Sequence, residues 1–436
     1  MELPLKFKER MLELMGKDYE DYISSYDRPA CKGLRINTLK TSLKPPVCSK
    51  RVPWCGSGYY YREGSPGKCA LHEAGAYYIQ EPSAMSVITA ADIRDGEIVL
   101  DLCAAPGGKS TQIACLNPSG LTISNEIIPS RAKILDQNTE RMGIANAAVT
   151  CASPLTLSRC WSAIFDTVIV DAPCSGEGMF RKADIAISEW SEENVKACAA
   201  RQREILDLAK QLVKCGGKLV YSTCTYSREE NEDNIAHFLK SNEDFEQIAS
   251  PLDKVEGIER GIGGLGYRLY PHKVEGEGHY VAVLRRKGDL KDVRYPKEKL
   301  QVNVKDLKLY KDWANKYLHN ALICNNQSGE MLYCTPESMP RMQGIKYLRL
   351  GLPLGTVSGG RFEPSHSLAL SLKPCDVKNN IDLNSQSAEA SAYLHGESLS
   401  CDMTGWTLVS VDGISLGWGK ASDGTLKNKY PKGLRK

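Results

Sequence analysis

The sequence lacks any apolar run of about 18 residues, the length that a membrane-spanning helix requires. Residues Met1–Lys17 alternate charged and apolar side chains, so they lack the continuous apolar stretch of a secretory signal. We therefore expect a cytoplasmic protein that does not bind membranes.

A disulfide framework and a zinc-binding pattern are also missing. The chain has 16 cysteines, but they are scattered without regular spacing. Cys48, Cys55 and Cys69 lack the paired C-x₂-C spacing of zinc sites, so we interpret them as ordinary thiols. His272 and His279 have no second pair of ligands nearby, and we favour a structural or substrate-lining role for them. We expect reduced thiols and no metal.

The net charge is only +3, which is too small to identify a nucleic-acid-binding protein by itself. However, Leu416–Lys436 holds six Lys and Arg residues against one acid, and Arg285–Lys316 is also rich in basic residues. Such runs are usually solvated surface charge. Because these two flank aromatic-rich segments, they also favour an RNA-facing surface.

At 436 residues the chain should form two or three domains. Between Ile93 and Lys287, strand and helix patterns alternate. Continuous apolar runs such as Thr167–Asp171 are typical of strands covered on both faces. This predicts a doubly wound parallel sheet that binds ligands at the carboxyl ends of its strands. The expected strands are Ile98–Leu102, Leu121–Asn125, Ala147–Cys151, Thr167–Asp171, Lys218–Ser222 and Tyr280–Leu284, and the expected helices are Thr111–Leu116, Ser130–Gly143, Ser191–Lys214 and Arg228–Ser241.

Three motifs follow predicted strands of this region. The segment DLCAAPGGKS (Asp101–Ser110) forms a glycine-rich turn between a strand and a helix, where Gly107 and Gly108 let the backbone turn tightly and approach a ligand. Two cysteine motifs lie at the ends of later strands, DAPCSGEG at Asp171–Gly178 and YSTCTYS at Tyr221–Ser227. The three motifs should therefore meet at one edge of the sheet.

With these motifs the chain resembles the RNA cytosine-5 methyltransferases of the Sun and RsmB/RsmF type, over roughly Gly33 to Arg435. The resemblance implies a Rossmann-like class I methyltransferase core, an N-terminal α+β subdomain of ferredoxin-like fold and a small C-terminal β domain of PUA-like fold. It implies S-adenosylmethionine as methyl donor and RNA, first of all ribosomal RNA, as substrate. We place the domains at residues 1–92, 93–287, 288–365 and 366–436, and we expect a monomer.

The donor site needs a carboxylate for the ribose hydroxyls. Glu126 ends the second strand, where the ribose-binding acid of a Rossmann-like site belongs, although it could instead be an acid that favours a helix dipole. The loop also departs from the G-x-G-x-x-G of dinucleotide sites. Ser153 stands where relatives have a polar or acidic adenine contact. By resemblance, the donor-binding residues are Cys103, Ala104, Ala105, Pro106, Gly107, Gly108, Lys109, Glu126, Arg131, Ser153 and Asp171.

Methylation at carbon 5 of cytosine is difficult because this carbon is a poor nucleophile, and addition of a thiolate to carbon 6 activates it. The resemblance assigns this attack to Cys224, product release to Cys174, and contact with the base and donor to Asp171. Lys109 would orient Asp171 or lower the pKa of a thiol. Because DNA cytosine methyltransferases attack with a proline-cysteine motif, Cys174 is the rival nucleophile; buried packing of both thiols is the remaining alternative.

RNA must also be gripped outside the pocket, since the target base leaves its stack. The candidates are Arg35, Asn37, Arg181, Lys182 and the basic C-terminus with Trp406, Trp418 and Tyr430, although these aromatics could instead form the core of the small β domain. Two other functions stay open: the same chemistry on transfer RNA or DNA, and a non-catalytic RNA-binding or ribosome-assembly factor. The intact set of Cys224, Cys174, Asp171 and Lys109 argues against the second.

Overall fold

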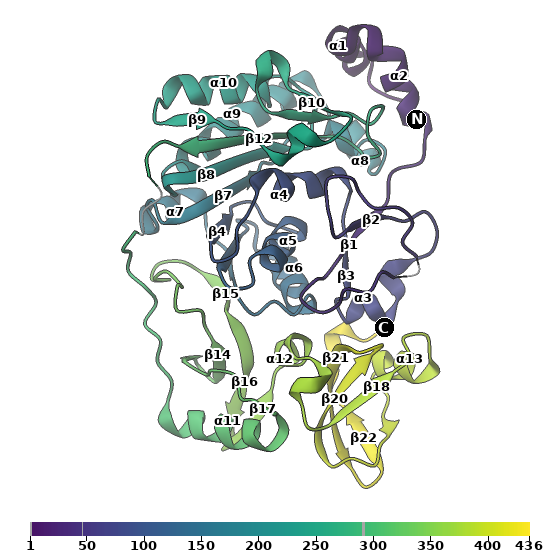
Figure 1. Cartoon of the computed structure of the whole chain (residues 1–436), viewed down its shortest axis with the longest axis vertical. Coiled ribbons are helices and arrows are strands. Elements are labelled where there is room, and N and C mark those ends of the chain that lie inside the picture. Colours follow the sequence, from purple (N-terminus) through teal and green to yellow (C-terminus); the bar gives the residue numbers. More distant parts are fainter. Residues whose placement is uncertain (1, 46, 290–292) are drawn as a thin grey trace.

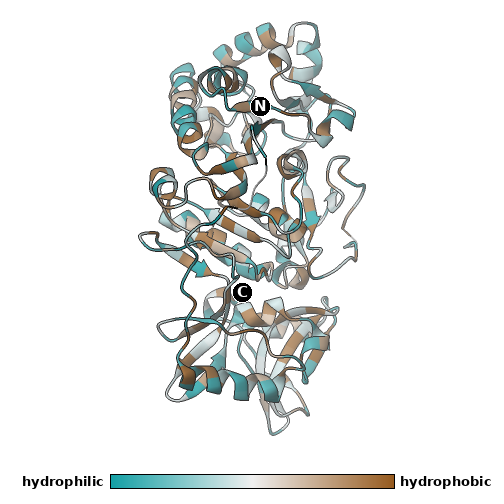
Figure 2. Cartoon of the chain, turned by 60° about the vertical axis from the view of Figure 1, so that its left-hand side comes forward, coloured by the Kyte–Doolittle hydropathy of each residue, from teal (hydrophilic) through white to brown (hydrophobic). Residues whose placement is uncertain are grey.

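The computed structural model describes residues 2–45, 47–289 and 293–436. A large sheet with helices on both faces occupies the upper and middle parts of the molecule, and two smaller β units lie below it (Figure 1). Hydrophobic residues concentrate on the inner strands, whereas the outer helices and loops are largely hydrophilic (Figure 2). Across the described ranges, no helix combines the length and apolarity needed to cross a membrane.

The large sheet forms the central unit and has the order β10-β11-β12-β8-β7-β4-β5-β6-β15, with β9 paired to β12. Its middle strands, from β8 to β6, are all parallel, and β12 is antiparallel to β8. The strands are β4 (Ile98–Asp101), β5 (Leu121–Asn125), β6 (Ala147–Thr150), β7 (Phe165–Asp171), β8 (Val213–Thr223), β9 (Phe245–Gln247), β10 (Ile258–Arg260), β11 (Tyr267–Leu269), β12 (His279–Arg286) and β15 (Tyr347–Leu350).

The chain runs from β4 to β5 in one direction and places β7 on the other side of β4, so the strand order reverses at β4. Ligands bind at such a switch point in doubly wound sheets. The covering helices are α4 (Ser86–Ala91), α5 (Gly108–Leu116), α6 (Pro129–Arg141), α7 (Pro154–Cys160), α8 (Asp184–Ser188), α9 (Glu192–Ala209) and α10 (Glu232–Ser241). The predicted Rossmann-like α/β core is confirmed.

All six predicted strands are present in this sheet, with ends shifted by a few residues. The largest difference concerns α9, which ends at Ala209 instead of continuing to Lys214. The strand β8 already begins at Val213 because the buried Val213 pairs with Phe165 of β7. Tertiary pairing thus overrides the helical propensity of the last residues.

The N-terminal subdomain is α+β, as expected. Its antiparallel sheet has the order β2-β1-β3, from β1 (Gly33–Ile36), β2 (Gly58–Tyr60) and β3 (Tyr77–Ile79), beside the short α3 (Ala70–Glu73). These are three strands in the described part, whereas a complete ferredoxin-like unit has four. The first helices, α1 (Leu5–Met15) and α2 (Tyr19–Ser24), lie on the central unit instead, because Phe7 and Tyr22 pack against Phe180, Trp190 and Tyr226.

The segment after the central unit forms α11 (Val304–Tyr317), a four-stranded antiparallel sheet and α12 (His366–Ser371). The sheet consists of β13 (Asn326–Ser328), β14 (Met331–Cys334), β16 (Leu352–Ser358) and β17 (Arg361–Pro364). Between β14 and β16 the chain returns to the large sheet, where β15 pairs antiparallel with β6. This segment is therefore joined to the central unit by backbone hydrogen bonds as well as by the chain.

The small C-terminal β domain has the strand order β18-β20-β21-β22-β19. Its elements are β18 (Asn380–Leu383), α13 (Ala388–His395), β19 (Leu399–Ser400), β20 (Gly405–Val411), β21 (Ile414–Ser422) and β22 (Thr425–Asn428). The polar, aromatic-poor stretch Asp376–Ser391 predicts an exposed loop from its sequence alone, and this prediction is wrong, because the stretch contains β18 and the start of α13. An edge strand such as β18 is half exposed and needs few apolar residues, and the Ser387 side chain caps α13.

The N-terminal subdomain and the C-terminal β domain share one hydrophobic core. Leu34 and Tyr77 from the former lie in the same buried cluster as Tyr393 and Leu394 from the latter. At the chain end, the ammonium group of Lys436 lies 2.8 Å from the Glu73 carboxylate. A shared core and this ion pair thus hold the N-terminal subdomain and the C-terminal β domain together.

Candidate active site

The candidate site lies where β4, β7, β8 and β12 meet at one edge of the large sheet. Asp171 is paired in register with Ser222, and Thr223 with Tyr280. The residues that follow or precede these pairs, Cys224 and His279, therefore lie beside Asp171. The sheet register brings together residues that are more than a hundred positions apart in the sequence.

The glycine-rich turn connects β4 to α5. Gly107 has φ +112° at the N-cap of α5, a conformation that favours glycine. A Cβ on Gly108 would lie 3.4 Å from side-chain atoms of Gln80 and Tyr78. The amide of Ala104 donates a hydrogen bond to the Asn125 carbonyl (2.8 Å), which holds the turn against the end of β5. The positive φ of Gly107 fits the predicted tight turn, whereas a Cβ on Gly108 would make ordinary van der Waals contact, and the approach of both glycines to a ligand stays a prediction.

Lys109 and Asp171 form an ion pair at the centre of the site. The Lys109 Nζ lies 2.6 Å from Asp171 Oδ2, and the Ser222 hydroxyl donates to Asp171 Oδ1 at 2.7 Å. Burial alone would raise the pKa of Asp171, but Lys109 and His279 outweigh it and hold that pKa well below its usual range. Burial would likewise lower the pKa of Lys109, but the Asp171 carboxylate outweighs it and raises that pKa. Both groups therefore stay charged at neutral pH.

The two motif cysteines are in contact, with 3.2 Å between the Sγ atoms of Cys174 and Cys224. Both are free thiols. The contact with Cys224, together with burial, raises the pKa of the Cys174 thiol well above its usual value. Cys174 is consequently a neutral thiol at physiological pH.

Glu126 lies at the end of β5 and is 3% exposed. Its carboxylate accepts a hydrogen bond from the Ile128 amide (3.0 Å) and lies 3.2 Å from Arg131. Arg131 also donates to the carbonyl of Ala105 (2.9 Å), so it links Glu126 to the glycine-rich turn. Ser153 uses its hydroxyl to cap α7, accepting from the Thr156 amide at 3.1 Å. A contact between Ser153 and an adenine would thus fall to its backbone amide.

Two further acids beneath the turn and the cysteines are buried. Asp101, at the end of β4, accepts a hydrogen bond from Ser110 (2.6 Å), and burial raises its pKa to about 7. Burial also raises the pKa of Glu230 to about 7, although Ser175 and Gln202 donate hydrogen bonds to it. Glu230 was not among the predicted site residues, because its one sequence signal is that it is an acid shortly after the YSTCTYS motif.

Comparison with known proteins adds to this geometry. Family models match four successive stretches: the N-terminal domain of 16S rRNA methyltransferase RsmF (residues 3–82), 16S rRNA methyltransferase RsmB/F (88–285), the RsmF rRNA methyltransferase first C-terminal domain (313–372) and the RsmF PUA domain (378–436). A relative from Shewanella piezotolerans, ribosomal RNA small subunit methyltransferase F, is 32% identical over 453 residues, which is 96% of this chain and 94% of the relative. The chain belongs to the RsmF family.

Other relatives and solved structures support this placement. Ribosomal RNA small subunit methyltransferase F of Escherichia coli O157:H7 is 31% identical and covers 99% of this chain and 96% of its own length. A methyltransferase homolog protein from Pyrococcus horikoshii shares 30% identity at a TM-score of 0.56, over 64% of this chain and 93% of that structure. NSun6 from the same organism, at 20% identity and a TM-score of 0.57, shares the fold over 66% of this chain and 99% of that structure.

Within this RsmF-family chain, three residues predicted to contact RNA are buried in the protein. Arg35 donates to Gln80, Gly108 and Thr111, and Asn37 donates to two backbone carbonyls. Arg181 pairs with Glu277 at 2.7 Å and its side chain is 5% exposed. The prediction of RNA contacts by Arg35, Asn37 and Arg181 is therefore wrong. Lys182 alone of the four candidates is exposed.

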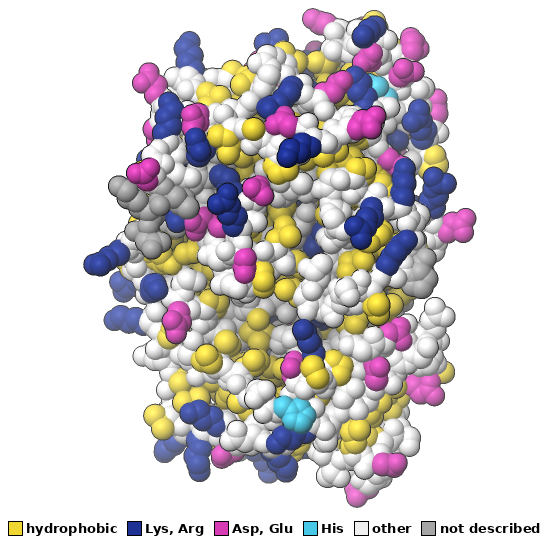
Figure 3. Space-filling model, in the orientation of Figure 1, with side chains coloured by type: hydrophobic (Ala, Val, Ile, Leu, Met, Phe, Trp, Pro, Cys, Tyr) yellow, Lys and Arg dark blue, Asp and Glu magenta, His cyan; other side chains and the backbone are white. Residues whose placement is uncertain are grey.

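In the C-terminal domain, the structure favours the core interpretation of the aromatic residues. Trp406, Trp418 and Tyr430 are 7%, 2% and 2% exposed, so they are packing residues. The surrounding basic side chains are exposed: Lys420, Lys427, Lys429, Lys432, Arg435 and Lys436. In Figure 3 further Lys and Arg side chains gather over α11 at the lower left. The exposure of these lysines and arginines is compatible with the expected RNA-facing surface, which stays a prediction.

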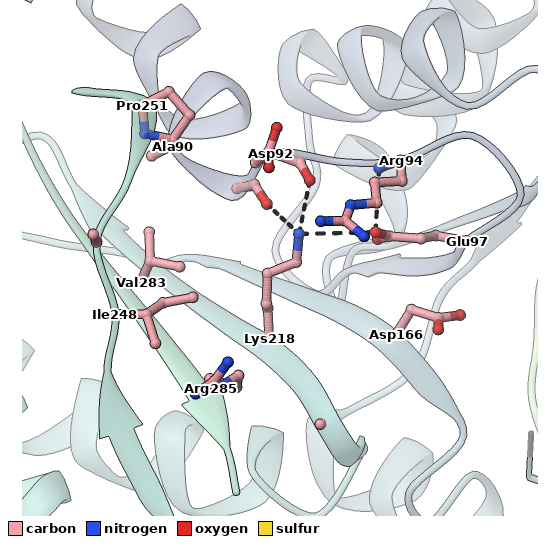
Figure 4. Close-up of a pocket in the computed structure, with 13 residues that line it drawn as sticks. Ala90, Asp92, Arg94, Glu97, Asp166, Lys218, Ile248, Pro251, Val283 and Arg285 are labelled. Carbon is pink, nitrogen blue, oxygen red and sulfur yellow. Dashed lines mark hydrogen bonds and ion pairs between the residues drawn. The ribbon is translucent and has the colours of Figure 1, made fainter. Parts of the chain in front are cut away.

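A separate cavity of about 310 Å³ lies near the amino ends of β4 and β8, away from the cysteines. Figure 4 shows the Lys218 side chain pointing towards several oxygen atoms. Its ammonium group donates to the carbonyls of Ala91 and Asp92 at 2.6 and 2.8 Å, and it lies 3.8 Å from the Glu97 carboxylate. Lys218 is thus occupied in bracing α4 against the sheet. This cavity has no thiol, and we place no chemistry in it.

Proposed function

We propose that this protein transfers a methyl group from S-adenosylmethionine to carbon 5 of cytosine in RNA, with small-subunit ribosomal RNA as substrate. The proposal rests above all on the 3.2 Å contact between Cys174 and Cys224 beside the Lys109–Asp171 ion pair. Two thiols next to a fixed ion pair suit a reaction that needs both a nucleophile and a proton carrier. Names of the relatives in the RsmF family support ribosomal RNA as substrate.

The residues present fit the methyl donor. The buried Glu126 carboxylate suits the ribose hydroxyls, and the turn at Gly107 and Gly108 exposes backbone without a Cβ. The Asp171 carboxylate would lie near the positive sulfonium. When bound, the donor supplies an electrophilic methyl group.

The pKa of Cys174 supports a division of labour between the thiols. The family resemblance assigns the attack to Cys224, whose sulfur would form a bond to carbon 6 and make carbon 5 nucleophilic, and the raised pKa of Cys174 agrees with this assignment. After carbon 5 has taken the methyl group, its proton must pass to a base so that the double bond re-forms and the sulfur–carbon bond breaks. Cys174, whose thiol contacts the leaving sulfur, would give its proton to the Cys224 thiolate and take up the carbon 5 proton in exchange. Asp171 and Lys109 orient the base and the donor.

The domains would share the work. We propose that residues 93–287 carry the chemistry, that residues 1–92 and 366–436 hold the RNA, and that residues 288–365 connect them. The protein would act as a monomer in the cytoplasm. Transfer RNA or DNA as substrate, and a non-catalytic role in RNA binding, are the competing functions.

Removal of each thiol tests the mechanism. Cys224→Ala should abolish methyl transfer and covalent adduct, whereas Cys174→Ala should stall release and leave protein bound to RNA. A denaturing gel should show a slow, nuclease-sensitive band for the Cys174 variant only. Cys375→Ala, which removes an exposed thiol of the C-terminal domain, should behave as the unchanged protein.

Other outcomes would change the proposal. An adduct with Cys224→Ala would reverse the two roles, and full activity of both variants would exclude the covalent mechanism. Bisulfite sequencing of total RNA from cells with and without the gene identifies the modified RNA; no lost cytosine mark in ribosomal RNA would contradict the substrate.

A further inference from the structure

Two loops carry the motif cysteines, and each loop is hydrogen-bonded to a buried carboxylate that lies in or next to the other loop. The Cys174 loop (residues 172–178) contains Ser175, whose amide and hydroxyl both donate to Glu230, at 3.0 and 2.5 Å. Glu230 follows the Cys224 loop (residues 224–228) and is fully buried. A third hydrogen bond to Glu230, from Gln202 of α9 at 2.8 Å, fixes the carboxylate.

The reverse connection comes from Glu177, which belongs to the Cys174 loop and is also fully buried. Its carboxylate accepts hydrogen bonds from the Tyr226 amide (2.8 Å) and the Ser227 hydroxyl (2.6 Å) of the Cys224 loop. Trp190 donates a third at 2.9 Å. Glu177 thus ties the Cys174 loop to the Cys224 loop, and Glu230 ties the segment after the Cys224 loop to the Cys174 loop.

Between the carboxylates, the residues that directly follow the two cysteines are also bonded. The hydroxyls of Ser175 and Thr225 lie 2.8 Å apart. The Gly178 amide donates to the Cys224 carbonyl at 2.8 Å. Each glutamate accepts three hydrogen bonds, whereas each of these direct contacts is a single bond, so the two glutamates should dominate this set.

We propose that Glu177 and Glu230 form a crossed clamp that keeps the thiol of Cys174 beside that of Cys224, and that this clamp is required for release of the methylated RNA. The inference rests on the proposed function, because it assigns release to Cys174. Both glutamates are positioning residues, since they contact the loops and not the reacting atoms.

The clamp should affect one step of the reaction only. Glu177→Gln and Glu230→Gln each replace an acceptor oxygen by an amide nitrogen that only donates, so each substitution removes hydrogen bonds and weakens the hold on the opposite loop. We expect kcat to fall about tenfold or more, while KM for RNA and donor changes less than about twofold. Covalent protein–RNA adduct should accumulate on a denaturing gel, as for Cys174→Ala. Glu229→Gln is the matched control, because Glu229 pairs with Arg10 of α1 and does not hold either loop.

A second measurement reports the thiol separation without RNA. Diamide oxidises two adjacent thiols to a disulfide by taking two protons and two electrons, and is itself reduced to the hydrazine. Ser175→Ala removes the hydroxyl bonds to Glu230 and Thr225 without changing charge, so it should slow formation of the Cys174–Cys224 disulfide several-fold relative to the unchanged protein. Peptide mapping identifies the bond.

The kinetic and the disulfide measurements together distinguish a failure of the clamp from a failure of the proposed function. If the glutamine variants keep normal kcat and adduct, or change KM instead, the clamp is wrong. If Ser175→Ala leaves disulfide formation unchanged, the loops are not held by these contacts and the clamp is also wrong. If Cys174→Ala gives no adduct while Ser175→Ala slows the disulfide, the clamp holds the thiols but the proposed release role of Cys174 fails.

Discussion

Single residues of the site divide into groups that stay charged and groups that stay neutral. Lys109 and Asp171 keep their charges because each offsets the burial of the other. Cys174 stays neutral because it is buried against a second thiol. This contrast agrees with the proposed roles, in which the ion pair orients ligands and Cys174 carries a proton.

Replacement of Glu126 tests the proposed donor site. If its carboxylate binds the ribose hydroxyls, Glu126→Ala should weaken S-adenosylmethionine binding by about 1.5–3 kcal/mol, the range of charged hydrogen bonds. Titration calorimetry measures the affinity. Ser153→Ala is a useful comparison, since its hydroxyl caps α7 and the loss should cost stability of about 1 kcal/mol and leave donor affinity nearly unchanged. Unchanged affinity of the Glu126 variant would remove Glu126 from the site.

Among the elements, β1 of the N-terminal subdomain has a role that its position in the chain does not indicate. Its Arg35 side chain reaches α5, where it donates to Thr111 at 2.7 Å and to the Gly108 carbonyl at 3.3 Å. Asn37, just after β1, donates to the Met142 carbonyl at the end of α6. The small sheet therefore braces the two helices that flank the glycine-rich turn.

Replacement of Arg35 should show this bracing role. Arg35→Ala leaves buried acceptors on Gln80 and Gly108 without their donor, so we expect the free energy of unfolding to fall by about 3 kcal/mol. Chemical denaturation measures this loss, and Arg28→Ala, on an exposed residue before β1, is the control. The salt dependence of RNA binding should be the same in both variants. A smaller salt dependence for the Arg35 variant alone would restore Arg35 as an RNA contact.

In the whole molecule, contacts between distant parts of the chain determine which basic residues are available to RNA. The C-terminal domain buries its aromatics against the connecting segment, as in the contact of Trp418 with Trp313, and shares a core with the N-terminal subdomain. Its lysines remain on the outside. Deletion of Leu416–Lys436 would remove most of β21 and all of β22, so substitution is the better test of these lysines.

A triple substitution of Lys420, Lys427 and Lys432 by Gln should weaken RNA binding and reduce its salt dependence. Each lost phosphate contact should lower the slope of log K against log salt by about 0.7–0.9. Filter binding over a range of salt concentrations measures this slope. The control changes the same charge on the central unit, at the exposed Lys196, Lys240 and Lys254. Equal slopes for the two triple variants would make the C-terminal lysines ordinary surface charge.

The sequence by itself determined the sheet and which motifs lie at the ends of its strands. Apolar runs such as Thr167–Asp171 identify buried parallel strands, and polar groups that directly follow them must meet at one sheet edge. The cysteines and the glycine-rich turn could therefore be predicted, because strand end and functional residue are neighbours in the chain. Their contact at 3.2 Å depends on the loops, which local patterns do not specify.

Only the tertiary structure decided which polar residues are structural. Arg35, Arg181 and Glu230 have partners 45, 96 and 55 positions away, and no local pattern distinguishes them from surface charges. Long-range pairing also decides β18, whose polar sequence forms a strand because its backbone pairs in parallel with β20 at the edge of the sheet. Burial and hydrogen bonding of such residues arise from the packing of whole domains, so their roles follow from long-range contacts and not from sequence spacing.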